Sequence, residues 1–501
     1  MPAQPSLTQR AFGVARRKAG GRVKRAVRRV AGRPLVAWER RSLRPVLSVV
    51  MPVYNVEGYV RECLDTVLTQ SLHNLEVIAV DDGSTDGSLE VLREFERRDA
   101  RVRVLTQTNS GQGIARNLGV QYAQGEFLAF IDSDDTIPPG SFEHMVDTLR
   151  RSGSDFCVGS VRRLRHSQYM RTTWQRTVHQ ADRIGTTLDE FPAAMQDIIC
   201  ANRMFRTTFW KQKVGGFRGH IAYEDHVPML TAYVRAQKFD ILSRVTYNWR
   251  IREDHTSTGQ QKANIENLLD RIAVKEEAHE LLTAEASDFV YDVWVARCLE
   301  VDFAPYAAQG LDADEAYRNI LSAAYRTFCD RATERAWDLV RVYPKVRGQL
   351  VAEGRWDAVE DATNYFLSVH QVPPTKVVDG VLVADLPTDR PFAADLPAHL
   401  LRMAPLEAHF EGVVQKVAWG DDHALITGWM RHRSLDITDP APGIELSLRR
   451  GDVVLPLEVE QLAIPEANLW AQLPYSGCEY GGFRARVPYS ALVGGDTTDR
   501  W

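Results

Sequence analysis

The stretch "EFLAFIDSDD", residues 126–135, is an apolar run that ends in three carboxylates within four residues. A short apolar run that stops abruptly at polar residues is typical of a buried strand. Three earlier stretches have the same character and alternate with helical patterns: "VLSVVMPVY" (46–54), "LEVIAVDDGS" (75–84) and "RVRVLTQ" (101–107). Apolar strands that alternate with helices predict an α/β fold, with a mostly parallel sheet and flanking helices.

A polar cluster follows each of these strands, and the four clusters read "PVYN", "DDGSTD", "NSGQG" and "DSDD". Because ligands of parallel sheets bind beyond the carboxyl ends of the strands, we expect one shared site there. Tyr54 offers a face on which a base can stack, and Asp82 or Asp81 offers only hydrogen-bond acceptors. Such an acceptor suits the N3–H of uracil or thymine and repels the lone pair of cytosine.

The last cluster has the chemistry of a cation site. Asp132, Asp134 and Asp135 supply hard oxygen ligands that suit Mg²⁺ or Mn²⁺. Carboxylates alone would repel a diphosphate, so a bridging cation is what would let a nucleotide diphosphate bind here. An EF-hand calcium loop is excluded because its Gly and its distal Glu are missing. A plain solvated turn remains the alternative.

These motifs, in this order and at about this spacing, resemble those of family 2 glycosyltransferases with the GT-A fold. The resemblance covers residues 45–260 and rests on "LSVVMPVYN", "EVIAVDDGSTDGS", "TNSGQGIARNLG", "GEFLAFIDSDD", "NRMFRTTFW", "AYEDHVPM" and "YNWRIREDHTST". Within the family, the chain looks most like bacterial cell-surface polymer enzymes, including wall teichoic acid sugar transferases. That likeness implies a helical linker and β-sandwich modules after the catalytic domain.

The resemblance implies a nucleotide-sugar pocket formed by Pro52, Tyr54, Asp82, Asn109, Gly111, Arg116, Asp132, Ser133, Arg252, His255 and Ser257. In this pocket Asp82 accepts from uracil N3–H. Asp134, with Asp132 beside it, holds Mg²⁺ or Mn²⁺ against the diphosphate. Arg252 belongs to a segment that closes over the diphosphate. Asp135 has no implied role.

The resemblance also implies the acid–base chemistry. Asp225 matches the general base that takes the proton of the acceptor hydroxyl, and Glu224 orients it or contacts the acceptor. A single displacement then inverts the anomeric configuration and needs no covalent nucleophile. The structural alternative is that Glu224 and Asp225 merely begin the helix "DHVPMLTAYVRA", stabilised by its dipole.

The function that follows is metal-dependent, inverting transfer of a hexose or N-acetylhexosamine from a UDP-sugar. The acceptor is a cell-surface polymer of polyol-phosphate or glycan type, or its lipid-linked precursor. Two enzyme alternatives stay open: a polyprenyl-phosphate sugar synthase, and the transferase part of a bifunctional teichoic-acid-type polymerase with a domain beyond Trp501. The non-enzyme alternative is a carbohydrate-binding scaffold that retains the fold.

Changes in composition and in the helix and strand patterns along the chain predict four parts: a basic segment (1–44), the GT-A domain (45–260), a helical linker region (261–405) and a β-sandwich domain (406–501). The sandwich is expected from short strands with regular turns, and it can mediate homo-oligomers. Its tryptophans can form a sugar platform, although core packing is the commoner role for such aromatics. They are Trp419, Trp429 and Trp470.

Charge and composition set the expected location. Residues 1–44 carry 13 Lys and Arg and one acid, while the whole chain has a net charge of −5. This segment can lie as an amphipathic helix on an anionic membrane face, or it is a disordered leader. A nucleic-acid partner is not expected, because no nucleic-acid module follows it. Six scattered cysteines without a C-x-x-C pair, and no apolar span or signal peptide, favour the cytoplasm, with or without peripheral contact with the inner membrane face.

Overall fold

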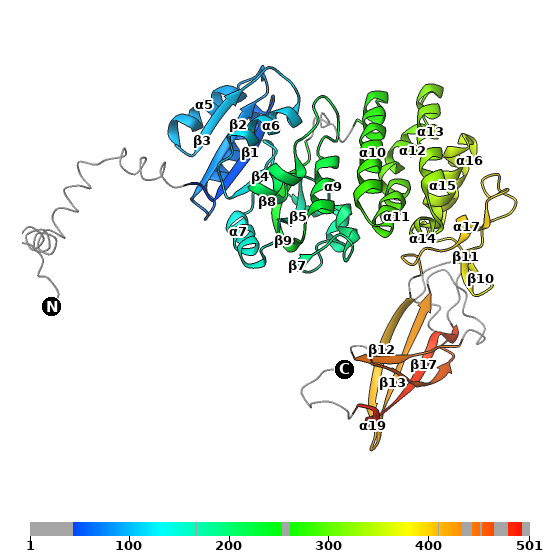
Figure 1. Cartoon of the computed structure of the whole chain (residues 1–501). Coiled ribbons are helices and arrows are strands. Elements are labelled where there is room, and N and C mark those ends of the chain that lie inside the picture. The colour runs from blue at the N-terminus through cyan, green and yellow to red at the C-terminus, as the bar shows by residue number, and fades with distance from the viewer. Residues whose placement is uncertain are drawn as a thin grey trace, which may run out of the picture. The chain divides into compact units, whose positions relative to one another are not determined.

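The computed structural model describes residues 44–165, 168–252, 261–408, 410–432, 443–450, 453–464 and 479–492 (Figure 1). The chain divides into two compact units, Met1–His255 with Glu276–Leu281 and Thr256–Lys275 with Leu282–Trp501. All four polar clusters of the predicted site belong to the first unit. Within the described ranges, no helix is long and apolar enough to cross a membrane.

One mixed sheet forms the centre of the first unit, with its strands in the order β3-β2-β1-β4-β8-β5-β9-β7 and β6 paired with β5. The strands are β1 (Leu47–Val53), β2 (Leu75–Asp81), β3 (Val102–Thr106), β4 (Phe127–Phe130), β5 (Phe156–Arg165), β6 (Gln168–Arg171), β7 (Arg183–Thr186), β8 (Arg203–Arg206) and β9 (Phe239–Arg250). Strands β3, β2, β1 and β4 are parallel, and β8 is antiparallel to its neighbours β4 and β5. The mostly parallel sheet predicted from the apolar stretches is confirmed.

Helices flank this sheet, as the alternation of strand and helix patterns predicts. They are α4 (Glu57–Leu68), α5 (Ser88–Arg98), α6 (Gln112–Tyr122), α7 (Ser141–Ser152), α8 (Thr207–Phe209) and α9 (His226–Arg235), with short turns η1 (Thr173–Arg176), η2 (Pro192–Gln196) and η3 (Trp210–Val214). Helix α6 approaches β1 closely at Gly119, where a Cβ would fall 2.4 Å from Val50 Cγ1. This contact brings the middle of α6, with Arg116, into the buried interior.

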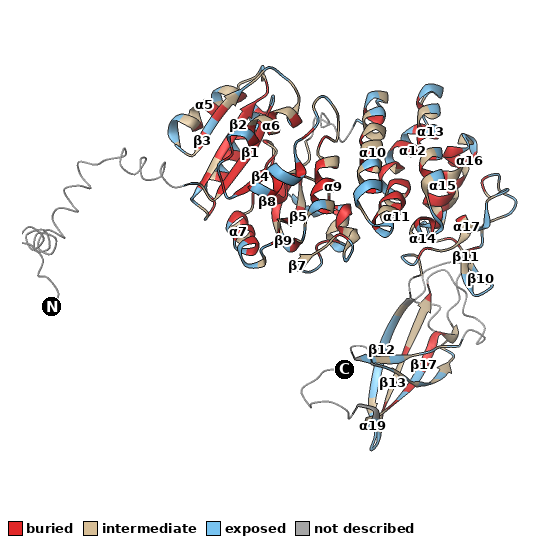
Figure 2. Cartoon of the chain, viewed as in Figure 1, coloured by how far each residue is buried: buried red, intermediate tan, exposed pale blue. Residues whose placement is uncertain are grey.

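The core of the first unit lies along the central strands, whose residues are buried almost throughout (Figure 2). Every residue of β1 is buried. At the end of β4, the Phe130 ring lies 4.7 Å from that of Trp210 and 5.0 Å from that of Phe217, centroid to centroid. Each such buried side chain contributes about 1.5–3 kcal/mol of stability. The packing around Phe130 fixes the end of β4, where the acidic motif begins.

Helices make up most of the second unit, as expected for the helical linker region. They are α10 (Ile265–Glu285), α11 (Asp288–Arg297), η5 (Cys298–Asp302), α12 (Ala304–Gly310), α13 (Glu315–Arg331), α14 (Glu334–Leu339), α15 (Val342–Ala352), α16 (Trp356–Ser368) and α17 (Ala398–Leu401). Several begin with a side-chain cap: Asn264, Ser287, Asp314 and Thr333 each accept a backbone N–H of the following turn. Caps of this kind explain where these helices start.

The C-terminal part of the second unit is rich in β-structure, as predicted. Its strands are β10 (Thr375–Val378), β11 (Val381–Ala384), β12 (Phe410–Trp419), β13 (His423–His432), β14 (Ser447–Arg450), β15 (Val453–Pro456), β16 (Glu458–Leu462) and β17 (Gly482–Pro488), with η6 (Glu479–Gly481) and α19 (Tyr489–Leu492). An antiparallel sheet has the order β12-β13-β17-β16, and β10-β11 and β14-β15 form two smaller sheets. Trp470 lies outside the described residues.

Candidate active site

The carboxyl ends of β2, β1 and β4 lie side by side, because these strands are parallel neighbours in the sheet. The residues that follow them are therefore brought to one edge. Tyr54 comes directly after β1 and is 47% exposed. Asn55 has a φ of 48°, and its side-chain oxygen accepts the backbone N–H of Thr85 at 2.8 Å. The Tyr54 ring is thus free for a ligand, while its neighbour ties together the loops after β1 and β2.

Asp82 is buried and holds the loop that follows β3. Its carboxylate accepts from Gln107 Nε2 at 2.7 Å and from the backbone N–H groups of Ser110 and Gly111, both at 2.8 Å. Gly111 has a φ of 87°, a conformation that favours glycine. Asp81 differs, because its buried Oδ1 has no hydrogen-bond partner among the described residues. The two acids that the sequence could not tell apart therefore have different surroundings.

Asp135, the acid without an implied role, is fully engaged within the protein. It is buried and accepts a hydrogen bond from Tyr247 Oη at 2.5 Å and another from the backbone N–H of Arg250 at 2.6 Å. Burial, followed by the charges of Asp134 and Asp132, raises its pKa well above the usual range. Asp135 therefore fastens the acidic motif to β9.

Asp132 and Asp134 lie on the accessible side of the motif, with side chains 31% and 17% exposed. Asp134 Oδ2 accepts a hydrogen bond from Arg252 Nε at 2.6 Å. Burial raises the pKa of Asp134, and the charge of Arg252 opposes that rise. Arg252, which the family resemblance places at the diphosphate, thus compensates the charge of the acidic motif.

The donor set of Asp132 and Asp134 fits a hard divalent cation. After burial, the charges of these two carboxylates are the next causes that raise the pKa of Asp135, so like charges crowd at this point. A divalent cation would relieve that repulsion, and Mg²⁺ and Mn²⁺ prefer carboxylate oxygens. Among the described residues, no group of three or more His, Cys, Asp or Glu side chains forms a complete metal cage. The remaining ligands would come from water and phosphate, as is usual for Mg²⁺.

Arg116 joins the acidic motif to the acids that begin α9. Its side chain is 2% exposed, donates to Asp132 Oδ1 at 2.6 Å and forms an ion pair with Glu224. The guanidinium carbon also lies 5.3 Å from the centre of the Phe217 ring. A buried guanidinium needs such paired carboxylates, because an uncompensated charge in the interior is costly. Arg116 therefore links two parts of the predicted site that are far apart in sequence.

Asp225 stands at the start of α9, but its side chain makes no capping hydrogen bond to that helix. Instead, its Oδ2 accepts the backbone N–H of Cys200 at 3.3 Å. Burial, followed by the charge of Glu224, raises the pKa of Asp225 to about 7, while Arg116 opposes the rise. A carboxylate with a pKa near neutrality is matched to proton abstraction at physiological pH. Asp225 therefore does begin α9, as the structural alternative has it, but it does so without a capping hydrogen bond from its side chain.

The other predicted residues have varied settings. Pro52 and Ser133 are buried, whereas Asn109 is exposed in the loop held by Asp82. His255 and Ser257 lie outside the described residues. The sequence did not single out Gln107, Cys200 or Tyr247 for the site. Only Tyr247 lay in a motif of the resemblance, "YNW", and nothing in the local pattern marks the other two as contacts of acids.

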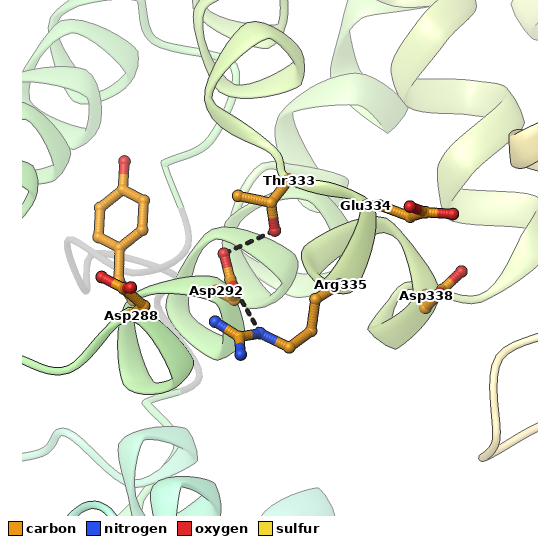
Figure 3. A pocket seen from close by; sticks show the side chains of 7 residues that line it. Asp288, Asp292, Thr333, Glu334, Arg335 and Asp338 are labelled. Carbon is orange, nitrogen blue, oxygen red and sulfur yellow. Dashed lines mark hydrogen bonds and ion pairs between the residues drawn. The ribbon is translucent and has the colours of Figure 1, made fainter.

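The second unit contains a cavity of about 550 Å³ between α11 and the start of α14 (Figure 3). Its lining is mainly acidic: Asp288, Tyr291, Asp292, Thr333, Glu334, Arg335 and Asp338. The buried carboxylate there, Asp292, already accepts from Thr333 Oγ1 at 2.8 Å and from Arg335 Nε at 2.5 Å (Figure 3). These contacts stabilise the start of α14, and nothing in the lining points to a ligand.

Comparison with known proteins agrees with this geometry. Residues 48–246 match the model of glycosyl transferase family 2. This match runs from β1 into β9 of the first unit. The putative glycosyltransferase EpsH of Bacillus subtilis is 45% identical over 104 residues, which cover 21% of this chain and 30% of EpsH. The poly(ribitol-phosphate) beta-glucosyltransferase of Bacillus spizizenii is 29% identical over 213 residues, 42% of this chain and 32% of that enzyme. The matched stretch thus spans about a third of each relative.

A similar fold is found in the crystal structure of S. aureus TarS 1–349 in complex with UDP-GlcNAc. It superposes with a TM-score of 0.56 at 22% identity and covers 69% of this chain and 98% of that one. A longer S. aureus TarS structure has a TM-score of 0.55 at 17% identity, covering 89% of this chain and 72% of that one. These likenesses concern the fold, and they confirm the GT-A-type architecture of the first unit.

Proposed function

We propose that the protein transfers a sugar from a UDP-sugar, with inversion and with a divalent cation, to a hydroxyl of a cell-surface polymer or its lipid-linked precursor. The observation that carries this proposal is the pairing of Arg116 with both Asp132 and Glu224. It ties a pair of carboxylates suited to a diphosphate-bound cation to a second pair that includes an acid with a pKa of about 7. Donor and acceptor chemistry would then meet at one edge of the sheet.

The donor would lie over the loops after β1, β2 and β3. Tyr54 stacks on the base, next to Pro52, and Asp82 accepts from uracil N3–H. Asn109, Gly111 and Ser133 border the nucleotide. Support for a uridine donor comes from structures of similar fold, one with UDP-GlcNAc and one with UDP.

The diphosphate would lie at the acidic motif. Asp132 and Asp134 would hold Mg²⁺ or Mn²⁺, and the bound cation would offset the charge that develops on the leaving UDP. Arg252 would leave Asp134 and contact the diphosphate. His255 and Ser257 belong to the same segment, which would close over the diphosphate. Arg252 can exchange Asp134 for the diphosphate because both partners are negatively charged. The cation would then compensate the charge of Asp134 in place of Arg252.

The acceptor would approach Asp225. Its carboxylate would take the proton of the attacking hydroxyl while the hydroxyl oxygen bonds to the anomeric carbon. The attack comes from the face opposite UDP, because the bond between the anomeric carbon and the UDP oxygen breaks in the same step and UDP leaves with its electron pair. Glu224 keeps its ion pair with Arg116 and so helps to hold Asp225 in place. The name of one relative, a poly(ribitol-phosphate) beta-glucosyltransferase, supports a polyol-phosphate acceptor. The sugar that we propose is a hexose or an N-acetylhexosamine.

The rest of the chain would serve localisation and assembly. We place the basic segment at 1–44, the transferase domain at 45–260, the helical region at 261–405 and the β-rich domain at 406–501. Of the basic segment, residues 1–43 lie outside the described residues. Its contact with an anionic membrane is tested by co-sedimentation with anionic vesicles, with and without residues 1–44. Homo-oligomers through the β-rich domain are tested by light scattering of the full chain.

The transfer itself is tested by screening UDP-, dTDP- and GDP-sugars for donor hydrolysis with and without EDTA. The proposal expects turnover of a UDP-sugar that stops with EDTA and returns with Mg²⁺ or Mn²⁺. Asp134→Ala and Asp225→Ala should both lose turnover. Metal-independent turnover, or unchanged rates in both variants, would contradict it.

A further inference from the structure

The end of the β12–β13 hairpin carries a large exposed aromatic ring. Trp419, the last residue of β12, is 76% exposed. Core packing, the role favoured from the sequence, is therefore wrong for this tryptophan. A single exposed apolar side chain is ordinary, so the surroundings of the Trp419 ring decide whether it belongs to a binding surface.

The ring is held in place by the residues around it. Trp419 stacks against Tyr489, with ring centroids 6.2 Å apart and planes 27° apart. Tyr489 is anchored twice, since its backbone N–H donates to Asp422 O at 2.9 Å and its Oη donates to Gly420 O at 3.1 Å. The backbone N–H of Gly420 donates to His423 O at 2.9 Å and closes the hairpin. A surface fixed before binding loses little freedom when a ligand arrives.

Oriented polar groups stand beside this aromatic pair. Asp422 Oδ1 lies 2.5 Å from His423 Nδ1, and Asp422 Oδ2 accepts from Arg486 Nη2 at 3.2 Å. The side chains of Asp422 and Arg486 are 73% and 47% exposed, so both retain hydrogen-bonding capacity toward solvent. A flat apolar face bordered by fixed donors and acceptors matches a pyranose, which has an apolar C–H face and a rim of hydroxyls.

We propose that Trp419 and Tyr489, with Asp422 and Arg486, bind the pyranose units of a carbohydrate chain. The site lies in the second unit and goes beyond glycosyl transfer, since it would hold a glycan that need not be reacting. A membrane fits less well, because Asp421 and Asp422 beside the ring would be repelled by anionic lipids. A second copy of the chain fits less well too, since it would have to bury these charges.

Isothermal titration of the full chain with chitohexaose and with cellohexaose tests the proposal. Wild type should bind at least one of them, and Trp419→Ala should weaken that binding by at least about fivefold. Trp419→Phe keeps a ring and should lose less. Two matched controls should bind as wild type: Tyr169→Ala, which removes a 53% exposed aromatic from β6, and Val414→Ala, which changes a 56% exposed residue of β12.

Each remaining outcome counts against the proposal. No binding of either saccharide by wild type, or equal binding by a folded Trp419→Ala variant, overturns it. Vesicle binding or self-association that depends on Trp419, without saccharide binding, assigns the ring to a membrane or to a second copy instead. The Asp225→Ala variant should bind the saccharide as wild type does, so a failure of this proposal is distinguishable from a failure of the transferase proposal.

Discussion

The Arg116 guanidinium donates to the Asp132 carboxylate over 2.6 Å while its own side chain is 2% exposed. The same group pairs with Glu224, the neighbour of the proposed base. Such a deeply buried charge restricts the positions of both carboxylates. If either one moved away, the Arg116 guanidinium would lose a partner in the interior, where an unpaired charge is costly. The relative positions of the proposed donor-binding carboxylate, Asp132, and of Glu224 beside the proposed base therefore depend on the Arg116 side chain.

Arg116→Lys is expected to lower kcat/KM by roughly 10- to 100-fold, the usual range for a residue that orients a metal ligand. Lysine keeps the charge but loses the planar fork that reaches two carboxylates at once. Steady-state kinetics of donor turnover measure the effect. Arg93→Lys, on the partly exposed surface of α5, is the matched control and should behave as wild type. Equal kinetics for both variants would remove the bridging role.

The pKa of about 7 for Asp225 predicts the pH dependence of the reaction. A general base must be deprotonated, so kcat/KM should rise with pH and level off above an apparent pKa near 7. Asp225→Asn should reduce the rate by about 10²- to 10⁴-fold and abolish this limb. pH–rate profiles of the wild type and of Asp225→Asn measure this dependence. If the variant showed the same rise near pH 7 as the wild type, a group other than Asp225 would be titrating.

Asp134 and Asp135 are adjacent in sequence, but we expect substitutions at Asp134 to lower metal affinity and substitutions at Asp135 to lower stability. Asp134→Asn should raise the Mn²⁺ concentration needed for half-maximal activity, with little change in stability, because its side chain is partly accessible. Asp135→Ala should instead destabilise the fold by about 1–3 kcal/mol, since Tyr247 Oη and the Arg250 N–H would lose their acceptor.

Manganese titration of activity and urea unfolding separate these two effects. Loss of metal affinity in Asp135→Ala without loss of stability would contradict the division of roles between the two acids.

Asp197, buried together with His179 and Arg203, supports the start of β8. Asp197 accepts from His179 Nε2 at 2.9 Å and from Arg203 Nη1 at 3.3 Å, with all three side chains fully buried. Burial alone would raise the pKa of Asp197, but Arg203 and His179 hold it below its usual value. The stability that comes from this depressed pKa is present above the ordinary Asp pKa and is lost as pH falls through the folded-state value.

Asp197→Ala should therefore cost about 3–5 kcal/mol at neutral pH, because it leaves a buried arginine uncompensated. It should also reduce the loss of stability on acidification. Urea unfolding at neutral and acidic pH measures both, with the exposed Asp421→Ala as control. A loss that is the same at every pH would contradict the electrostatic account.

The parts of the fold that are encoded locally could be predicted from the sequence. Runs such as "VIAV" (77–80), in which every residue is apolar, require burial on both faces, so they indicate parallel central strands, and β2 contains this run. The polar residues that follow such strands then meet at one edge for topological reasons. Tyr54, Asp82 and Asp132 are grouped in this way by their positions in the sequence alone.

Contacts between distant residues could not be predicted. Arg116 and Glu224 are 108 residues apart, and no periodicity links them. Asp134 and Asp135 have the same side chain, and only the position of Tyr247 on β9 decides which one is engaged. The exposure of Trp419 likewise depends on the hairpin that presents it, because a tryptophan in an apolar strand is otherwise typical of a core.

The central claim is inverting transfer from a UDP-sugar with Asp225 as the base. ¹H NMR of the product formed from an α-linked UDP-sugar, in wild type and in Asp225→Asn, tests it most directly. We expect a β-anomeric product in wild type and almost none in the variant. An α-anomeric product, or undiminished β-product from Asp225→Asn, would contradict it.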